Sequence, residues 1–388
     1  MSSINPSLKV MIIIDTAYIG GPGKGLLQML KYQRSERYNF VICTFEYRKP
    51  KSIEFIDAVR SAGHELRLLP QRYRFDPAAL FKAFDIVRTE HIDLVQSHGY
   101  KAHVVAFVIS MRKRLPWLAL THGWTWENWK VRVYNQLERV LLKQADIAAA
   151  VSPPLLKELE KIRGAQLRSR LIPNAVDADE IQGHLGGHAV REEYDIPSDH
   201  VLLGVFGRLS PEKGVAEVLV AFHSVYSGVK NVTLLFVGNG KLATPLKSRV
   251  AELGLESQVK FAGYQSDMRD FYDAIDILVI PSLSEGLPNV LLEAMSLEVP
   301  AVCTRVGAIP DVIRHGETGW LVLPGDSHCL ADQLREVILN PELRQKVASS
   351  ARASLHPRFS PATRAKQFEL IYDELLLGNS LAKDNPSE

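Results

Sequence analysis

The stretch Ile277-Leu-Val-Ile-Pro-Ser-Leu-Ser-Glu285-Gly-Leu-Pro-Asn-Val-Leu-Leu-Glu293 predicts a strand, a loop and a helix in immediate succession. Its first four residues form an apolar, largely β-branched run that is typical of a buried strand. Pro288 marks the start of the helix, because proline is favoured in the first helical turn. Free amides of Gly286, Leu287 and their neighbours, together with the helix dipole, then favour a phosphate at the helix N-terminus.

Two carboxylates belong to this unit. Glu285 precedes the predicted helix and Glu293 lies eight residues further on, about two helical turns away. The pair is therefore suited to contact different hydroxyls of one extended ligand. The alternative interpretation is that Glu285 stabilises the helix dipole and Glu293 is an exposed helix residue.

The same alternation of apolar runs and helix-length segments continues along the whole chain. Such alternation predicts an α/β fold with parallel strands, right-handed crossovers and ligands beyond the C-terminal strand ends. The predicted strands are 10–14, 40–44, 65–69, 94–97, 117–121 and 147–151 in the first half, and 201–206, 233–237, 259–262, 277–280 and 299–304 in the second.

The length of 388 residues predicts two domains. Between Asn174 and Arg191 the sequence changes to His, Gly and acidic residues without apolar periodicity, which indicates a linker. We predict a first domain at 1–178, a linker at 179–192 and a second domain at 193–362. Two doubly wound, Rossmann-like domains on one chain are expected to face a central cleft that binds small ligands.

The composition limits where the protein works. The three cysteines are scattered, which indicates neither a disulfide framework nor a zinc site and fits a reducing cytoplasm. The apolar run at 10–14 is too short for a signal-peptide core. We therefore expect a cytoplasmic protein, at most peripheral at the inner face of the cytoplasmic membrane.

Charge is unevenly distributed. Residues 1–190 hold 27 Lys and Arg against 18 Asp and Glu, whereas residues 191–388 hold 19 against 26. A basic half is suited to nucleic acid, anionic lipid or phosphorylated substrates. Within it, residues 111–132 interleave cations with Trp117, Trp124, Trp126 and Trp129. This pattern indicates either a membrane-surface patch for a lipid-linked acceptor or a packed helix with snorkelling cations.

Two cations follow another predicted strand, in Phe206-Gly-Arg208-Leu-Ser-Pro-Glu-Lys213-Gly214. A guanidinium donates forked hydrogen bonds to phosphate oxygens and an ammonium supplies a compact charge, so the pair is suited to a diphosphate leaving group. Because the charge on such a group grows as its bond breaks, this contact lowers the barrier. The alternative is that both are solvated surface charges.

Glycines and histidines mark strand ends in the first half. Gly20-Gly-Pro-Gly-Lys-Gly25 permits close backbone approach to a ligand, but it lacks P-loop and dinucleotide spacing and also fits a tight turn. His122 follows the strand at 117–121 and is expected to point into the cleft, and His98 at the end of the preceding strand is expected on the acceptor side. Either histidine can instead be structural.

Taken together, these motifs resemble the fourth family of retaining glycosyltransferases, whose fold is GT-B. The resemblance spans nearly the whole chain. Its most specific elements are the Glu285 and Glu293 pair, the Arg208 to Lys213 loop, Ile172-Pro-Asn-Ala-Val-Asp177 and Val306-Gly-Ala-Ile-Pro310.

The resemblance implies roles for single residues. Arg208 and Lys213 would bind the donor diphosphate, Glu285 the donor sugar and Glu293 the ribose. His122 would lie near the donor sugar and phosphate. The other donor-binding positions are Gly21, Gly207, Gly263, Tyr264, Gly286, Leu287, Asn289 and Val290, and Gly23 and Lys24 stand on the acceptor side. Many relatives carry Gly-Gly followed closely by Glu, whereas this chain has Gly-Gly-Pro-Gly-Lys.

The implied activity is transfer of a sugar from a UDP- or GDP-linked donor to a glycan, lipid-linked or small-molecule acceptor, by front-face displacement. No metal, cofactor or nucleic-acid partner is expected, and the helix at about 363–377 is expected to cross back onto the first domain. The alternatives are a non-catalytic sugar-nucleotide-binding subunit and a Rossmann oxidoreductase. The oxidoreductase requires a dinucleotide fingerprint that the chain lacks.

Overall fold

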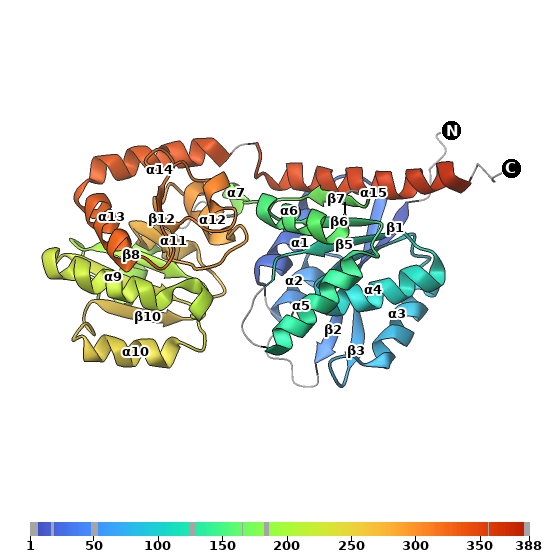
Figure 1. Cartoon of the computed structure of the whole chain (residues 1–388), viewed down its shortest axis with the longest axis horizontal. Coiled ribbons are helices and arrows are strands. Elements are labelled where there is room, and N and C mark those ends of the chain that lie inside the picture. The colour runs from blue at the N-terminus through green and yellow to red at the C-terminus, as the bar shows by residue number, and fades with distance from the viewer. Residues whose placement is uncertain are drawn as a thin grey trace. The chain divides into compact units, whose positions relative to one another are not determined.

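The chain forms two compact α/β units, each built on one parallel sheet (Figure 1). Unit 1 comprises Met1–Asn174 and Pro361–Glu388, and unit 2 comprises Ala175–Ser360. This computed structural model describes residues 7–16, 19–47, 53–124, 129–164, 166–181, 186–355 and 357–383. Trp126 and the C-terminal residues 384–388 lie outside the described residues.

The sheet of unit 1 has the strand order β3-β2-β1-β4-β5-β6-β7, and all its strands are parallel. Helices cover both faces, so the central strands are buried and largely apolar, and Val10 to Ile13 are fully buried, whereas the second half of β4 carries the buried polar residues Gln96, Ser97 and His98. The strands are β1 (Leu8–Ile14), β2 (Tyr38–Tyr47), β3 (Glu65–Gln71), β4 (Leu94–His98), β5 (Trp117–Thr121), β6 (Ile147–Ala150) and β7 (Arg168–Leu171).

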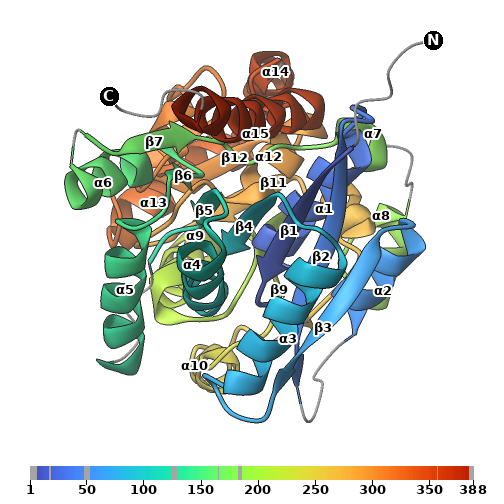
Figure 2. The ribbon, with the colours of Figure 1, turned by 90° about the vertical axis from the view of Figure 1, so that its right-hand side faces the viewer.

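Helices of the described part of unit 1 cover both faces of this sheet (Figure 2). One face packs against α1 (Gly21–Tyr32), α2 (Glu54–Ser61) and α15 (Pro361–Lys383), and the other against α3 (Pro77–Thr89), α4 (Tyr100–Lys113), α5 (Trp129–Leu142) and α6 (Pro153–Arg163). The C-terminal helix α15 contributes Phe368 and Tyr372 to the core of unit 1. Arg170 of β7 also bonds to Glu374 of α15 at 2.7 Å. The last helix of the chain is therefore an integral part of unit 1.

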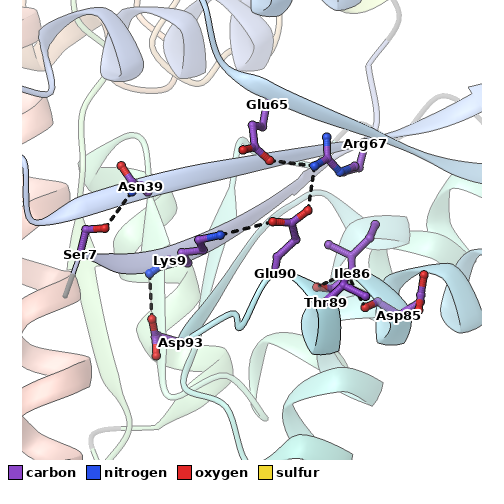
Figure 3. A network of polar contacts seen from close by, with 10 residues as sticks. All are labelled: Ser7, Lys9, Asn39, Glu65, Arg67, Asp85, Ile86, Thr89, Glu90 and Asp93. Atoms are coloured by element: carbon purple, nitrogen blue, oxygen red, sulfur yellow. Dashed lines mark hydrogen bonds and ion pairs between the residues drawn. The ribbon is translucent and has the colours of Figure 1, made fainter.

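An ionic network ties the N-terminal edge of this sheet together (Figure 3). Glu90, just after α3, accepts hydrogen bonds from Arg67 of β3 at 2.7 Å and from Lys9 of β1 at 3.3 Å. The backbone amide of Lys9 donates to Asp93 at 2.8 Å. The bond from Arg67 holds the pKa of Glu90 below its usual value. The network joins two strands and a helix far apart in the sequence.

The sheet of unit 2 has the order β10-β9-β8-β11-β12-β13, again parallel throughout. Its strands are β8 (Val201–Phe206), β9 (Val232–Val237), β10 (Val259–Gly263), β11 (Ile277–Ile280), β12 (Ala301–Thr304) and β13 (Trp320–Val322). Its helices are α7 (Ala178–Ile181), α8 (Gly187–Glu193), α9 (Val215–Gly228), α10 (Ala243–Glu252), α11 (Arg269–Ala274), α12 (Asn289–Ser296), α13 (Ser327–Leu339) and α14 (Pro341–Leu355). Two doubly wound parallel sheets confirm the predicted fold class.

The segment predicted as a linker differs from that expectation. Residues 187–193 form helix α8, whose Val190 joins the core of unit 2. The amide of Gly187 donates to Asp273 at 2.8 Å, and a Cβ at Gly187 would lie 2.5 Å from the backbone of that residue. Arg191 forms an ion pair with Asp276 at 2.7 Å. The glycine therefore serves close packing; residues 182–185 lie outside the described part of the chain.

The segment 111–132 supplies core residues as well as surface. Trp117 is fully buried in β5 and donates to Ser97 at 2.7 Å, and Trp124 is 9% exposed. These two indoles pack inside unit 1, Trp117 from a strand and not from a helix as the packed interpretation had it, and residues 125–128 lie outside the described part. Throughout the described residues, no helix has the length and apolar character needed to cross a membrane.

Candidate functional site

Two loops of unit 2 meet where its strand order reverses. Strands β8 and β11 are neighbours. The strand that follows β8 in the chain, β9, lies on one side of this pair, and the strand that follows β11, β12, lies on the other. Ligands of doubly wound folds bind beyond the C-terminal strand ends at such a point. The loop after β8 carries Arg208 and Lys213, and the loop after β11 carries Glu285. All three side chains line one small hollow with Ser282 and Val290.

Lys213 and Glu285 are paired within this hollow. Nζ of Lys213 lies 2.5 Å from Oε1 of Glu285, and the same carboxylate oxygen accepts a bond from Ser282 Oγ at 2.8 Å. The Glu285 side chain is only 10% exposed and that of Lys213 is 29% exposed. Because an ammonium carries three donors, Lys213 can retain Glu285 and still bind an anionic ligand.

Arg208 borders the hollow and is more exposed than the other two residues. Its side chain is 59% exposed, and Nη1 lies 3.8 Å from Oε1 of Glu212. Such an exposed, long ion pair contributes little free energy.

Glycines hold the Glu285 loop in place. Gly214 has φ of +63°, and a Cβ there would lie 1.9 Å from the carbonyl oxygen of Pro281. Gly307 has φ of +56°, and its Cβ would lie 2.1 Å from the carbonyl oxygen of Glu285. The amide of Ala308 also donates to the carbonyl of Gly286 at 2.9 Å. The Val306 to Pro310 motif thus braces this loop, a role that the sequence analysis did not assign.

Glu293 is an interior residue of unit 2, so its interpretation as an exposed helix residue is wrong. It is 6% exposed and accepts a bond from the hydroxyl of Tyr272 at 2.6 Å. Burial and this carboxylate raise the pKa of Tyr272 well above its usual value, so the hydroxyl stays a donor. A carboxylate held in this way can accept hydrogen bonds from a ligand.

The other predicted positions of unit 2 lie at or just after the ends of its strands β8, β10 and β11. Gly286, Leu287, Asn289 and Val290 form the loop and the first turn of α12, and Oδ1 of Asn289 is buried with no hydrogen-bond partner among the described residues. Gly263 ends β10, where its carbonyl accepts a bond from Gly238 at 2.7 Å. Gly238 in turn packs on Gly207, since its Cβ would lie 1.9 Å from the Gly207 carbonyl oxygen. Tyr264 is 47% exposed.

Unit 1 brings its two predicted histidines together. His98 ends β4, His122 follows the neighbouring β5, and Nδ1 of His98 lies 3.1 Å from Nε2 of His122. Burial, and then the electrostatic effect of Arg364 and of the neighbouring His103, lower the pKa of His122 to about 3. The pKa of His98 lies well below its usual value, chiefly because of burial. Both imidazoles are therefore neutral at pH 7.

The glycine segment of unit 1 is the start of a helix. Gly21, Gly23 and Lys24 form the first turn of α1, and the amide of Lys24 bonds to the Gly20 carbonyl at 2.8 Å. The helix begins beyond β1, which neighbours β4, so its first turn belongs to the same sheet edge as His98. Apart from Glu293, which lies in the second turn of α12, the predicted site residues lie at or just beyond the C-terminal strand ends of their own sheets, and the roles assigned to them stay predictions.

Comparisons with known proteins agree on one family. The sequence profile described as glycosyl transferases group 1 matches residues 188–354, and the profile described as glycosyltransferase family 4 matches residues 19–180. N-acetyl-alpha-D-glucosaminyl L-malate synthase of Bacillus anthracis is 27% identical over 311 residues, which cover 78% of this chain and 80% of that protein. The capsular polysaccharide biosynthesis glycosyltransferase CapM of Staphylococcus aureus is 28% identical over 205 residues, about half of each protein at 52% and 53%.

A solved structure shares the fold. HepE of Anabaena, crystallised in complex with UDP-glucose, superimposes with a TM-score of 0.82 over 95% of this chain and 100% of that chain, at 22% sequence identity. The likeness extends over both units, and at this identity it is a likeness of fold.

Proposed function

Because the chain belongs to the fourth family of glycosyltransferases, the glycosyl transferases group 1, we propose that it transfers a sugar from a nucleotide diphosphate sugar to an acceptor with retention of anomeric configuration. The observation that carries this proposal is the hollow of unit 2, which is lined by Arg208, Lys213 and Glu285 at the switch point of the sheet. Two cations and a carboxylate at this position suit a diphosphate joined to a sugar.

The donor is proposed to bind unit 2 through three kinds of contact. Lys213 and Arg208 bind the diphosphate, and the amides of the first turn of α12 add donors for its oxygens. Glu293, buried beside Tyr272, accepts from the ribose hydroxyls. Glu285 orients the transferred sugar. HepE was crystallised with UDP and with UDP-glucose, which makes UDP-linked sugars the first donors to test, ahead of GDP-linked ones.

The chemistry rests on the leaving group. The bond between the anomeric carbon and the diphosphate oxygen breaks, and the charge that develops is stabilised by Lys213 and Arg208. The acceptor hydroxyl attacks on the same face, and its proton passes to the departing phosphate oxygen. Glu285 is held by Lys213 and Ser282, which favours an orienting carboxylate over a nucleophile of the glycosidase kind. The mechanism as proposed needs no metal ion or cofactor.

The acceptor is proposed to bind unit 1 and to be a glycan, a lipid-linked sugar or a small molecule. CapM, named for capsular polysaccharide biosynthesis, favours a role in cell-surface polysaccharide synthesis. Peripheral membrane contact through unit 1 belongs to the same proposal. Met111 at the end of α4 and Val140 of α5 are 65% and 58% exposed, near several cations.

The test is release of nucleoside diphosphate by the full chain from a panel of UDP- and GDP-linked sugars. Lys213→Ala and Arg208→Ala are expected to lower the release at least about a hundredfold, the loss typical of one transition-state donor. Arg249→Ala is the matched control, because Arg249 is 58% exposed and pairs with Glu252 as Arg208 pairs with Glu212. Release that is equal in all three variants, or thermal stabilisation by nucleotide sugars without any release, would contradict the proposal.

A further inference from the structure

A chain of hydrogen bonds connects the C-terminal helix of unit 1 to His122. The hydroxyl of Tyr372, on α15, donates to Oε1 of Gln96 on β4 at 2.5 Å. Nε2 of Gln96 lies 2.7 Å from Nε2 of His98. Nδ1 of His98 lies 3.1 Å from Nε2 of His122. We call these four side chains the histidine relay.

The direction of the relay follows from its first bond. The Tyr372 hydroxyl is also 3.7 Å from Sδ of Met29, but sulfur is a weak acceptor, so the proton goes to Gln96. The carbonyl oxygen of Gln96 therefore faces Tyr372 and its amide nitrogen faces His98. An amide nitrogen only donates, so Nε2 of His98 accepts.

The remaining protons are then determined. A neutral His98 that accepts at Nε2 carries its proton on Nδ1, and it donates that proton to Nε2 of His122. A neutral His122 that accepts at Nε2 likewise carries its proton on Nδ1. Among the described residues none bonds to Nδ1 of His122, and the residue is partly exposed. The relay thus leaves one N–H donor for a ligand.

The surroundings keep the relay neutral. Arg364 of α15 is 3% exposed, and no acidic side chain of the described chain pairs with it. His103 of α4 bonds to Ser97 at 2.8 Å and lies 3.4 Å from Glu138. Burial is the main factor that opposes a proton on His98 or His122, and the positive charge of Arg364 adds to it. A neutral relay has the single proton arrangement derived above.

We propose that Tyr372 and Gln96, acting through His98, are positioning residues that fix His122 as the Nδ1–H tautomer, so that His122 donates a hydrogen bond to a sugar hydroxyl or phosphate oxygen of the substrate. The identity of that substrate rests on the proposed function. The tautomer itself does not, because it depends only on contacts within unit 1. His122 in this state is a donor and cannot take a proton from the acceptor through Nε2.

The direct test is the tautomer of His122 in the ligand-free full chain, read from the imidazole nitrogen shifts by NMR. The expected result is a single Nδ1–H tautomer. Tyr372→Phe and Gln96→Leu are expected to shift a substantial fraction of His122 to Nε2–H, with about a tenfold fall in kcat, since one hydrogen bond is misdirected, and little change in the KM for the donor. An Nε2–H tautomer in the unmodified chain would overturn the proposal.

Tyr38→Phe is the matched control. The Tyr38 hydroxyl bonds to Asp373 of α15, and its ring lies 5.2 Å from that of Tyr372, but it has no link to Gln96. It is expected to leave both the tautomer and kcat unchanged, and equal effects of Tyr38→Phe and Tyr372→Phe would overturn the relay. An inactive chain with the Nδ1–H tautomer refutes the proposed function alone, whereas an active chain with Nε2–H refutes the relay alone.

Discussion

Gly307→Ala tests whether the Glu285 loop must be held where it lies. Gly307 has φ of +56°, and a Cβ there would lie 2.1 Å from the Glu285 carbonyl oxygen and 2.6 Å from that of Gly286. Both neighbours are backbone atoms, so no side chain can rotate away. The substitution must displace the loop that carries Glu285 or the segment that carries Gly307.

The size of the effect follows from these distances. Ordinary contact begins at 3.4 Å, so the Glu285 carbonyl must move by about 1.3 Å, the difference between 3.4 and 2.1 Å. A misplacement of about 1 Å at a reacting centre costs about a hundredfold in rate. The positive φ adds about 1 to 2 kcal/mol of strain for a residue with a Cβ. We expect about a hundredfold loss of kcat and a measurable loss of stability.

The assay compares Gly307→Ala with Gly254→Ala by donor turnover and urea unfolding. Gly254 has a similar φ of +64°, but nothing lies within 4 Å of its Cβ position. Its substitution is expected to cost the same backbone strain without loss of turnover. If Gly307→Ala retains full turnover, or if the two variants lose turnover equally, the bracing role of Gly307 is refuted.

Three further predictions concern pKa shifts and buried donors. Glu90→Gln should lower the free energy of unfolding by about 1 kcal/mol at pH 7. Because the pKa of Glu90 is lowered in the folded state, this contribution is present above pH 4.5 and is lost as the pH falls. Urea unfolding at several pH values measures it. The pKa of His122 is lowered from 6.5 to about 3 in the folded state, so the free energy of unfolding is highest above pH 6.5 and decreases as the pH falls toward 3. Arg364→Gln should raise this pKa, which an NMR titration measures. Tyr272→Phe removes a donor from buried Glu293 and should change UDP affinity by several-fold in calorimetry, whereas unchanged affinity would exclude Glu293 from the nucleotide site.

Much of the fold was predictable because the buried strands are continuous apolar runs. The predicted bounds of β8 and β11 agree with the structure at both ends. Strand β7, Arg-Ser-Arg-Leu, was not predicted, because an edge strand with three polar residues carries no apolar run. Strand β13 has only three residues, too few for a periodic pattern. Helix α8 lies in the predicted linker because its glycine, Gly187, serves close packing against Asp273 and not flexibility.

The site was predictable where it depends on strand ends. Lys213 and Glu285 follow neighbouring strands, so the doubly wound pattern alone indicates that they approach each other. Their direct ion pair and the burial of Glu293 beside Tyr272 required coordinates. The histidine relay was beyond sequence reasoning for a physical reason. Tyr372 and Gln96 are 276 residues apart, and only the packing of α15 on unit 1 brings them into contact.

The binding of UDP to Lys213 tests the central claim most directly. The dissociation constant of UDP, measured by calorimetry on the full chain, is expected to rise at least about tenfold in Lys213→Ala, since a charge-assisted bond to phosphate is lost. Lys230→Ala, which removes an exposed lysine of unit 2 beside Tyr226, is expected to leave it unchanged. Equal UDP affinity in the unmodified chain and in Lys213→Ala would contradict the account.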